Sequence, residues 1–198
     1  ETLQAIATPG SPQQLAHAWV LQMQHEHKPV NYPNWKKRQM FALATLYYSL
    51  GGGNGYWPAH IQGSWLQDDD ECTWLSSKDL DINYEFIGEF VGSSNSNISN
   101  SHDIVCQDGR FRVLALSLLN LDRFQGARLP AEVALLSEVE QIKVEKSSIR
   151  SALMDFIPEE LVSLSNLTTL SFAKNAMTGT LPTTIGALAS LQRLHLER

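Results

Sequence analysis

The chain has 198 residues and a net charge of -6 at pH 7, and 43% of its residues are hydrophobic and 18% charged. This is the composition of an ordinary globular protein that is long enough to bury a core. The acidic balance disfavours a nucleic-acid partner, because phosphate binding needs clustered Lys and Arg. No segment approaches the ~20 apolar residues of a membrane-spanning helix.

Two amphipathic helices are predicted at the start of the chain. Ser11 is a preferred N-cap and Pro12 fits the first helical position, so a helix begins there and ends before Pro29. A second helix is expected over residues 34–50, where apolar side chains recur at helical spacing. The glycine-rich run 51–55 ends it.

The segment that follows has few periodic features but is rich in aromatic residues. Its tryptophans Trp57, Trp65 and Trp74 are expected to be buried and to close one end of the later repeats. The acidic run 68–71 is interpreted as a solvated loop, since it lacks the spacing of a calcium-binding loop. The Ser- and Asn-rich run 92–103 has almost nothing to bury and is interpreted as a mobile loop.

From residue 111 onward, one apolar-x-apolar phrase recurs at near-constant spacing. Its four copies are Val113–Leu116, Gln141–Val144, Thr169–Phe172 and Arg193–Leu196. Their anchors Leu114, Ile142, Leu170 and Leu194 lie 28, 28 and 24 residues apart. A fixed period in this range predicts a solenoid whose stacked units pair their short strands into a parallel sheet. One unit alone cannot offset the entropy of ordering it, so neighbouring units must share a core.

The outward side of the predicted sheet is the candidate ligand-binding surface. Side chains alternate along a strand, so the residues between the buried anchors face outward. These residues are Val113, Ala115, Ser117, Gln141, Lys143, Glu145, Thr169, Ser171, Ala173, Arg193, His195 and Glu197. Such a concave face suits an extended protein, peptide or glycan ligand. The alternative interpretation is that these are merely solvated strand positions.

The third unit closely resembles the plant-type leucine-rich repeat. It reads Leu167-x-x-Leu170-x-Phe172-x-x-Asn175-x-Met177-x-Gly179-x-Leu181-Pro182-x-x-Ile185-x-x-Leu188. The Gly-x-Leu-Pro segment is typical of that type. The resemblance implies that Asn175 satisfies backbone groups in the turn after the strand. The equivalent position is Leu119 in the first unit and Ser147 in the second, so irregular turns are expected there.

Before the repeats come Trp65-Leu66, Glu71-Cys72-x-Trp74, Val105-Cys106 and Gly109-Arg110, and this order of residues resembles the N-terminal cap of the same family. The earlier stretches Ser11-Pro12…Ala18-Trp19 and Arg38-x-x-Phe41-Ala42-Leu43-Ala44-Thr45-Leu46-Tyr47-Tyr48 look like the cap of leucine-rich-repeat proteins from diatoms and related algae. The implied fold is an α/β leucine-rich-repeat solenoid, with a parallel sheet on the concave side, preceded by a helical, Trp-rich cap. Residues 1–110 would form the cap and residues 111–198 about three and a half repeats. We expect the chain to be a piece of a longer protein, because the last unit lacks a polar closing repeat.

Two features indicate an extracellular or cell-surface location. The chain has two cysteines, which allow one internal disulfide, and the cap resemblance implies that Cys72 pairs with Cys106. In the plant proteins these cysteines lie only several residues apart, whereas 33 residues separate them here. Asn97 and Asn166 begin glycosylation sequons.

No catalytic motif is found, so the chain is not predicted to be an enzyme. The sequence has no His-Glu-x-x-His spacing, no nucleophile elbow and no kinase catalytic triplet. The His residues of His25-Glu26-His27 point apart on a helix, and the glycine-rich run 51–55 lacks the Lys-Ser/Thr of a phosphate-binding loop. We therefore predict no metal and no cofactor.

The leading hypothesis is a non-catalytic binding module, the N-terminal part of an extracellular receptor-like or adhesion protein. Its expected partner is a protein, peptide or glycan, with no nucleic acid, and a membrane would be reached only through segments absent from this chain. One alternative is an inhibitor of an extracellular enzyme, like the polygalacturonase-inhibiting proteins with this repeat type. Another is the ectodomain of a receptor-like serine/threonine kinase whose catalytic domain lies outside this chain.

Overall fold

A computed structural model describes residues 2–26, 32–57, 62–63, 65–67, 71–74, 106–107, 109–111, 113–116 and 127–197. The helices are α1 (Thr2–Ile6), α2 (Pro12–Glu26), α3 (Asn34–Ser49) and the short α5 (Leu153–Phe156). The strands are β1 (Cys106–Gln107), β2 (Arg110–Phe111), β3 (Val113–Leu116), β4 (Gln141–Val144), β5 (Thr169–Ser171) and β6 (Arg193–His195). The 3-10 turns are η1 (Gly52–Asn54), η2 (Glu71–Thr73), η5 (Ala131–Leu135), η6 (Glu159–Ser163) and η7 (Thr183–Ala187).

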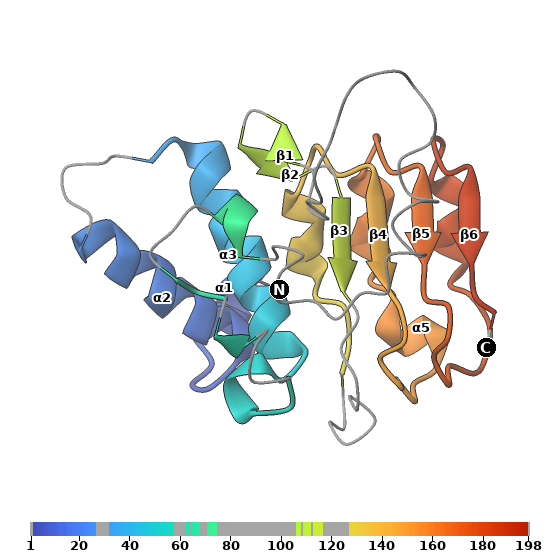
Figure 1. Cartoon of the computed structure of the whole chain (residues 1–198), viewed down its shortest axis with the longest axis horizontal. Helices are drawn as coiled ribbons and strands as arrows, with labels where there is room; N and C mark the ends of the chain where they lie inside the picture. The colour runs from blue at the N-terminus through green and yellow to red at the C-terminus, as the bar shows by residue number, and fades with distance from the viewer. Residues whose placement is uncertain are drawn as a thin grey trace.

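The N-terminal helices pack together at one end of the sheet (Figure 1), where α3 contacts both α2 and η5. α2 begins as predicted, because the backbone N–H of Gln14 donates to Ser11 Oγ at 3.0 Å. α3 buries most of its apolar side chains, including Leu43 and Leu46. α1 has no counterpart in the sequence analysis, and it buries none of its five residues.

The four strands β3, β4, β5 and β6 form one parallel sheet in sequential order. Leu114 pairs with Ile142, Ile142 with Leu170, and Leu170 with Leu194. This is the pairing that the repeat spacing predicts. A shift of one residue in any strand would turn its leucines toward the other face of the sheet, so this register places the apolar anchors in one row.

Each strand is connected to the next through a short turn on the other side of the sheet. η5, η6 and η7 each follow a proline with extended backbone, namely Pro130, Pro158 and Pro182. Proline suits this position because its fixed φ and missing N–H cost nothing at the start of a helical turn. η5 contacts η6, and η6 contacts η7, so these turns stack in the same order as the strands.

One hydrophobic core runs through the cap and the repeats. It joins the cap residue Leu46 and the three tryptophans to Ile142 and Leu170 of the sheet. Trp57, Trp65 and Trp74 are all buried, as predicted. Ring centroids lie 4.9 Å apart for Trp57 and Trp65 and 5.8 Å apart for Trp65 and Trp74. The aromatic cluster is therefore part of the same core as the sheet residues Ile142 and Leu170.

The interpretation of the acidic run as a solvated loop is wrong for Glu71. Its side chain is buried, and Oε2 lies 2.7 Å from Lys36 Nζ. Oε1 accepts a hydrogen bond from Gln39 Nε2 at 2.8 Å. A buried carboxylate needs such partners, because removing it from water is costly. Residues 68–70 and the loop 92–103 lie outside the described residues.

Candidate functional site

The outer face of the sheet carries polar side chains in columns that cross the strands. One column runs through Gln141, Thr169 and Arg193, and the next through Lys143, Ser171 and His195. The β3 residue in register with Lys143 is Ala115, for which only the backbone is described. Ser117 lies outside the described residues. The structure thus brings together the predicted residues of β4, β5 and β6.

Much of this face is buried, so the prediction that it is open to a ligand is wrong for these positions. The relative exposure is 9% for Lys143, 5% for Glu145, 1% for Thr169, 0% for Ser171 and 3% for Ala173. Gln141 is partly exposed, and Arg193, His195 and Glu197 are exposed. Alternation along a strand predicts which side of a sheet a residue faces but not whether that side is covered.

The buried part of the face is held by polar contacts. Ser171 Oγ donates a short hydrogen bond to Glu145 Oε1. Ser147 Oγ donates to the backbone oxygen of Glu145 at 2.9 Å. Buried polar groups are stable only with such partners. Glu145, Ser147 and Ser171 therefore fix the centre of the face.

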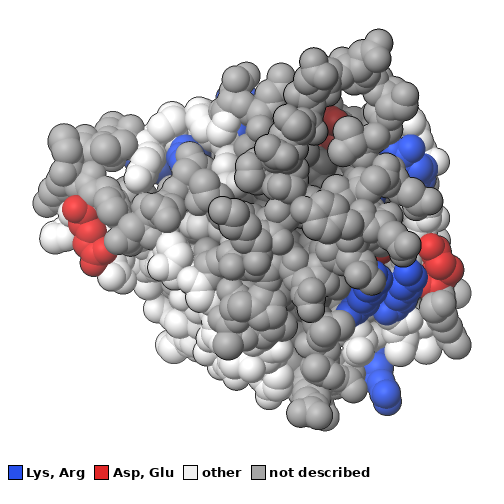
Figure 2. All heavy atoms as spheres, viewed as in Figure 1, with Lys and Arg blue, Asp and Glu red and all other residues white. Residues whose placement is uncertain are grey.

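The exposed part of the face lies on and after β6. Arg193 Nε donates to Thr169 Oγ1 at 3.1 Å, which orients the guanidinium across the neighbouring strand. His195 Nδ1 lies 3.7 Å from Glu197 Oε1, and these side chains are 46% and 64% exposed. Basic and acidic side chains are both visible at the β6 end of the molecule in Figure 2. The β6 column thus presents an oriented guanidinium, an imidazole and a carboxylate to solvent.

Asn175 fixes the turns beneath this face. Its Oδ1 accepts hydrogen bonds from the backbone N–H groups of Ser147 and Ile149 at 3.0 and 3.2 Å. Its Nδ2 donates to the backbone oxygens of Val144 and Phe172 at 2.7 and 3.0 Å. These contacts are the backbone satisfaction predicted for this asparagine. They tie the end of β4 to the end of β5.

The turns after β4 and β5 share a left-handed backbone. Lys146 has φ 50° and Lys174, 28 residues later, has φ 56°. Ser148 is also left-handed, with φ 52°, in the unit that lacks the asparagine. Residues other than glycine rarely adopt this backbone conformation. The second unit therefore has the more irregular turn, as predicted, while the turn of the first unit lies outside the described residues.

Comparison with known proteins assigns no family. No protein-family model matches the chain. No curated protein matches it significantly. The resemblance to plant-type leucine-rich repeats therefore stays a prediction from the residues quoted above.

The remaining predicted features are placed as follows. Cys72 is disulfide-bonded, and Cys106, the other cysteine of the chain, lies in β1. Asn166 is exposed in a turn after η6, whereas Asn97 lies outside the described residues. Within the described ranges, no helix is long and apolar enough to span a bilayer. Those ranges also hold no group of three His, Cys, Asp or Glu side chains placed to bind a metal.

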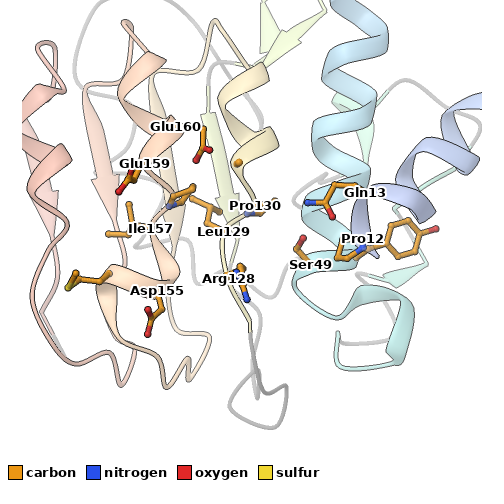
Figure 3. A pocket seen from close by; sticks show the side chains of 14 residues that line it. Pro12, Gln13, Ser49, Arg128, Leu129, Pro130, Asp155, Ile157, Glu159 and Glu160 are labelled. Carbon is orange, nitrogen blue, oxygen red and sulfur yellow. The ribbon is translucent and has the colours of Figure 1, made fainter. Parts of the chain in front are cut away.

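A hollow on the opposite side of the molecule was missed by sequence reasoning. It has a volume of about 540 Å³ and lies between the start of α2, the end of α3 and the segments around η5, α5 and η6 (Figure 3). Arg128, Asp155, Glu159 and Glu160 line it. The repeated Leu/Ile-Pro pairs could have indicated this hollow, because its charged residues lie within two positions of Leu129-Pro130 and Ile157-Pro158.

Proposed function

We propose that the chain is a non-catalytic ligand-binding module, the N-terminal part of an extracellular leucine-rich-repeat protein of the receptor-like or adhesion class. Its ligand is a protein, peptide or glycan that contacts the outer face of the sheet. The observation that carries the proposal is the in-register stacking of β4, β5 and β6, which aligns their polar side chains in columns and leaves Arg193, His195 and Glu197 exposed.

The repeated build of each coil supports the leucine-rich-repeat assignment. In the coils that begin with β4 and β5, a short parallel strand and a turn are followed by a Leu/Ile-Pro pair and a 3-10 turn. Asn175 holds the turn as an asparagine of that family would. Solenoids of this kind bind partners along an extended face, because each coil contributes one row of side chains.

Two observations support an extracellular location. Cys72 is disulfide-bonded, and disulfides persist mainly in oxidising compartments. Asn166 begins a sequon and is exposed, so an oligosaccharide could be attached there without disturbing the core.

Arg193 is the residue on which we expect binding to depend most. Its guanidinium is exposed, and the bond from Nε to Thr169 leaves the terminal nitrogens available to a ligand. A guanidinium binds a carboxylate or sulfate with paired hydrogen bonds and can also donate to sugar hydroxyls. His195 and Glu197 add one donor or acceptor each beside it.

The experiment is a screen of the intact disulfide-bonded chain against peptide and cell-wall oligosaccharide arrays, followed by titration of each hit. Arg193→Ala is expected to weaken a genuine hit about tenfold, the value of one charged hydrogen bond. Arg150→Ala is the matched control, because Arg150 is exposed but lies outside the strands. The proposal would be contradicted if Arg193→Ala and His195→Ala bound every hit with the same affinity as Arg150→Ala.

A further inference from the structure

The hollow between the N-terminal helices and the 3-10 turns continues into a second one. The second has a volume of about 630 Å³ and is lined by residues of α1, η5 and η6. The two hollows share Gln13, Ala131 and Glu160. They therefore form one groove, which runs along the side of the molecule away from the outer sheet face and which we call the helix-side groove.

One half of the helix-side groove is apolar and open. Ala5, Ala131, Ala134, Leu135 and Val162 line it. Leu135 and Val162 are 38% and 39% exposed, although both are large apolar side chains. Leu3 on the adjacent α1 is 84% exposed. Apolar side chains gathered at a concave surface are typical of a site that a partner covers.

The other half of the groove is acidic. Its lining holds the carboxylates of Asp155, Glu159 and Glu160 and a single basic side chain, Arg128, which gives a formal charge of -3 + 1 = -2. In Figure 3 the three carboxylates lie on the side of the hollow away from Pro12, Gln13 and Ser49, and Arg128 lies between the two groups. All four charged side chains are exposed. The ion pairs of the described residues involve none of the three carboxylates.

A buried carboxylate of η5 faces α1. Glu132 lines the apolar half and is 3% exposed. It accepts hydrogen bonds from Thr2 Oγ1 at 2.9 Å and from Gln13 Nε2 at 3.2 Å. Both donors are neutral, and a carboxylate can accept about four hydrogen bonds. A cation entering the groove would therefore be attracted by Glu132 as well as by the exposed acidic half.

We propose that the helix-side groove binds a basic amphipathic peptide segment of a partner protein. Its Lys or Arg side chains pair with Asp155, Glu159 and Glu160, and its leucine-like side chains cover Leu135 and Val162. An acidic half beside an apolar half favours this occupant over a simple cation, which would leave the apolar half open. The same lining favours a basic amphipathic segment over a purely apolar one, which would leave the carboxylates unpaired.

The test is fluorescence anisotropy with a short labelled peptide that has a Lys-rich half and a Leu-rich half, added to the intact chain. Replacing Asp155→Asn together with Glu160→Gln is expected to weaken binding about tenfold, since each exposed ion pair contributes modestly. Val162→Ser is expected to weaken it about threefold through lost apolar contact. Raising the salt concentration should weaken binding to the native chain and affect the double variant less.

Glu26→Gln is the matched control. Glu26 is an exposed carboxylate at the far end of α2 from Gln13, about 20 Å along the helix. Its replacement is expected to leave the affinity unchanged. The substitutions are at exposed positions, and circular dichroism of each variant shows whether the fold is kept.

Three results would overturn the proposal. The first is no binding of the Lys-Leu peptide to the native chain, or binding that the double variant leaves intact. The second is equal binding of a peptide with Glu in place of Lys. The third is equal binding of a Lys peptide without Leu, which would assign the groove to cations alone.

Discussion

At the scale of single residues, Asn175 joins two coils through one side-chain amide. It bonds backbone groups at the ends of both β4 and β5, and its exposed fraction is 6%. Four backbone groups are satisfied in this way. The position of the outer-face columns therefore depends on this residue, although it is not itself in a column.

Replacing Asn175→Ala is expected to lower the free energy of unfolding by about 2–4 kcal/mol, because buried backbone donors and acceptors lose their partners. The midpoint of urea denaturation measures this change. Asn166→Ala, at an exposed position, is the control and is expected to change stability by less than about 0.5 kcal/mol. Equal midpoints for the two variants would contradict the role given to Asn175.

Tyr47 and Tyr48 make stability depend on alkaline pH. Burial raises the pKa of both phenols above the ordinary value; a hydrogen bond with Gln62 partly offsets this for Tyr47, and the charge of Tyr47 adds to it for Tyr48. The folded chain thus holds these protons more tightly than the unfolded chain. Their contribution is complete below the unfolded pKa of about 10 and is lost as the pH rises through the folded pKa.

Urea midpoints measured from about pH 8 to about pH 11 should therefore fall at the alkaline end. The double variant Tyr47→Phe with Tyr48→Phe should show a flatter decline, whatever its stability at neutral pH. A decline of the same steepness in both proteins would mean that other groups cause it.

At the scale of elements, a substitution in β5 tests whether the strands share one stacked core, because β5 lies between β4 and β6. Leu170 is fully buried and pairs with both Ile142 and Leu194. Leu170→Asp would place a carboxylate among apolar side chains, and its desolvation is comparable to the whole stability of a domain. The variant is expected to be unfolded by circular dichroism.

Leu170→Ala separates the effect of charge from that of lost volume. It is expected to fold with a loss of about 2–5 kcal/mol, which is typical of a large-to-small change in a core. A Leu170→Asp variant as stable as Leu170→Ala would show that this side chain does not face the core.

The elements with strong sequence periodicity could be predicted, and the others could not. The helices α2 and α3 begin at or next to the expected residues, because Ser11-Pro12 and the period of apolar residues mark them. Strand register follows from the 28- and 24-residue spacing. α1 escaped prediction because five residues are too few to show a helical period.

The candidate site was predictable in composition but not in exposure. The period of two along each strand identifies Lys143, Ser171 and His195 as one column, and the structure aligns them. It does not reveal that Lys143 and Ser171 are buried while His195 is exposed, because alternation assigns a side of the sheet and not its exposure. The helix-side groove was missed because its walls come from α1, α2 and coils more than 100 residues later.

At the scale of the whole molecule, one hydrophobic core joins the N-terminal helices to the repeats. The hydrophobic core is continuous from Leu46 to Leu188. Polar contacts also cross between them: Thr2 and Gln13 donate to Glu132, and Arg110 pairs with Glu138 at 3.1 Å. We therefore expect a single unfolding transition for residues of both parts.

The disulfide of Cys72 constrains the chain. The chain has only one other cysteine, Cys106, so the closed loop would contain about 35 residues, and its loss is expected to cost about 3–4 kcal/mol. Mass spectrometry of peptides from the secreted chain, before and after reduction, should show Cys72 joined to Cys106. Two free thiols in the secreted protein would contradict the extracellular proposal.

The proposed binding face requires β4, β5 and β6 to be stacked in one register, since a shifted strand would point its polar side chains toward the core. The most direct measurement is the set of nuclear Overhauser contacts between backbone protons of neighbouring strands in the intact, labelled chain. We predict contacts that join Ile142 to Leu170 and Leu170 to Leu194. Contacts that pair Leu170 with Lys143 or with His195 instead, or no contacts between these strands, would contradict the account.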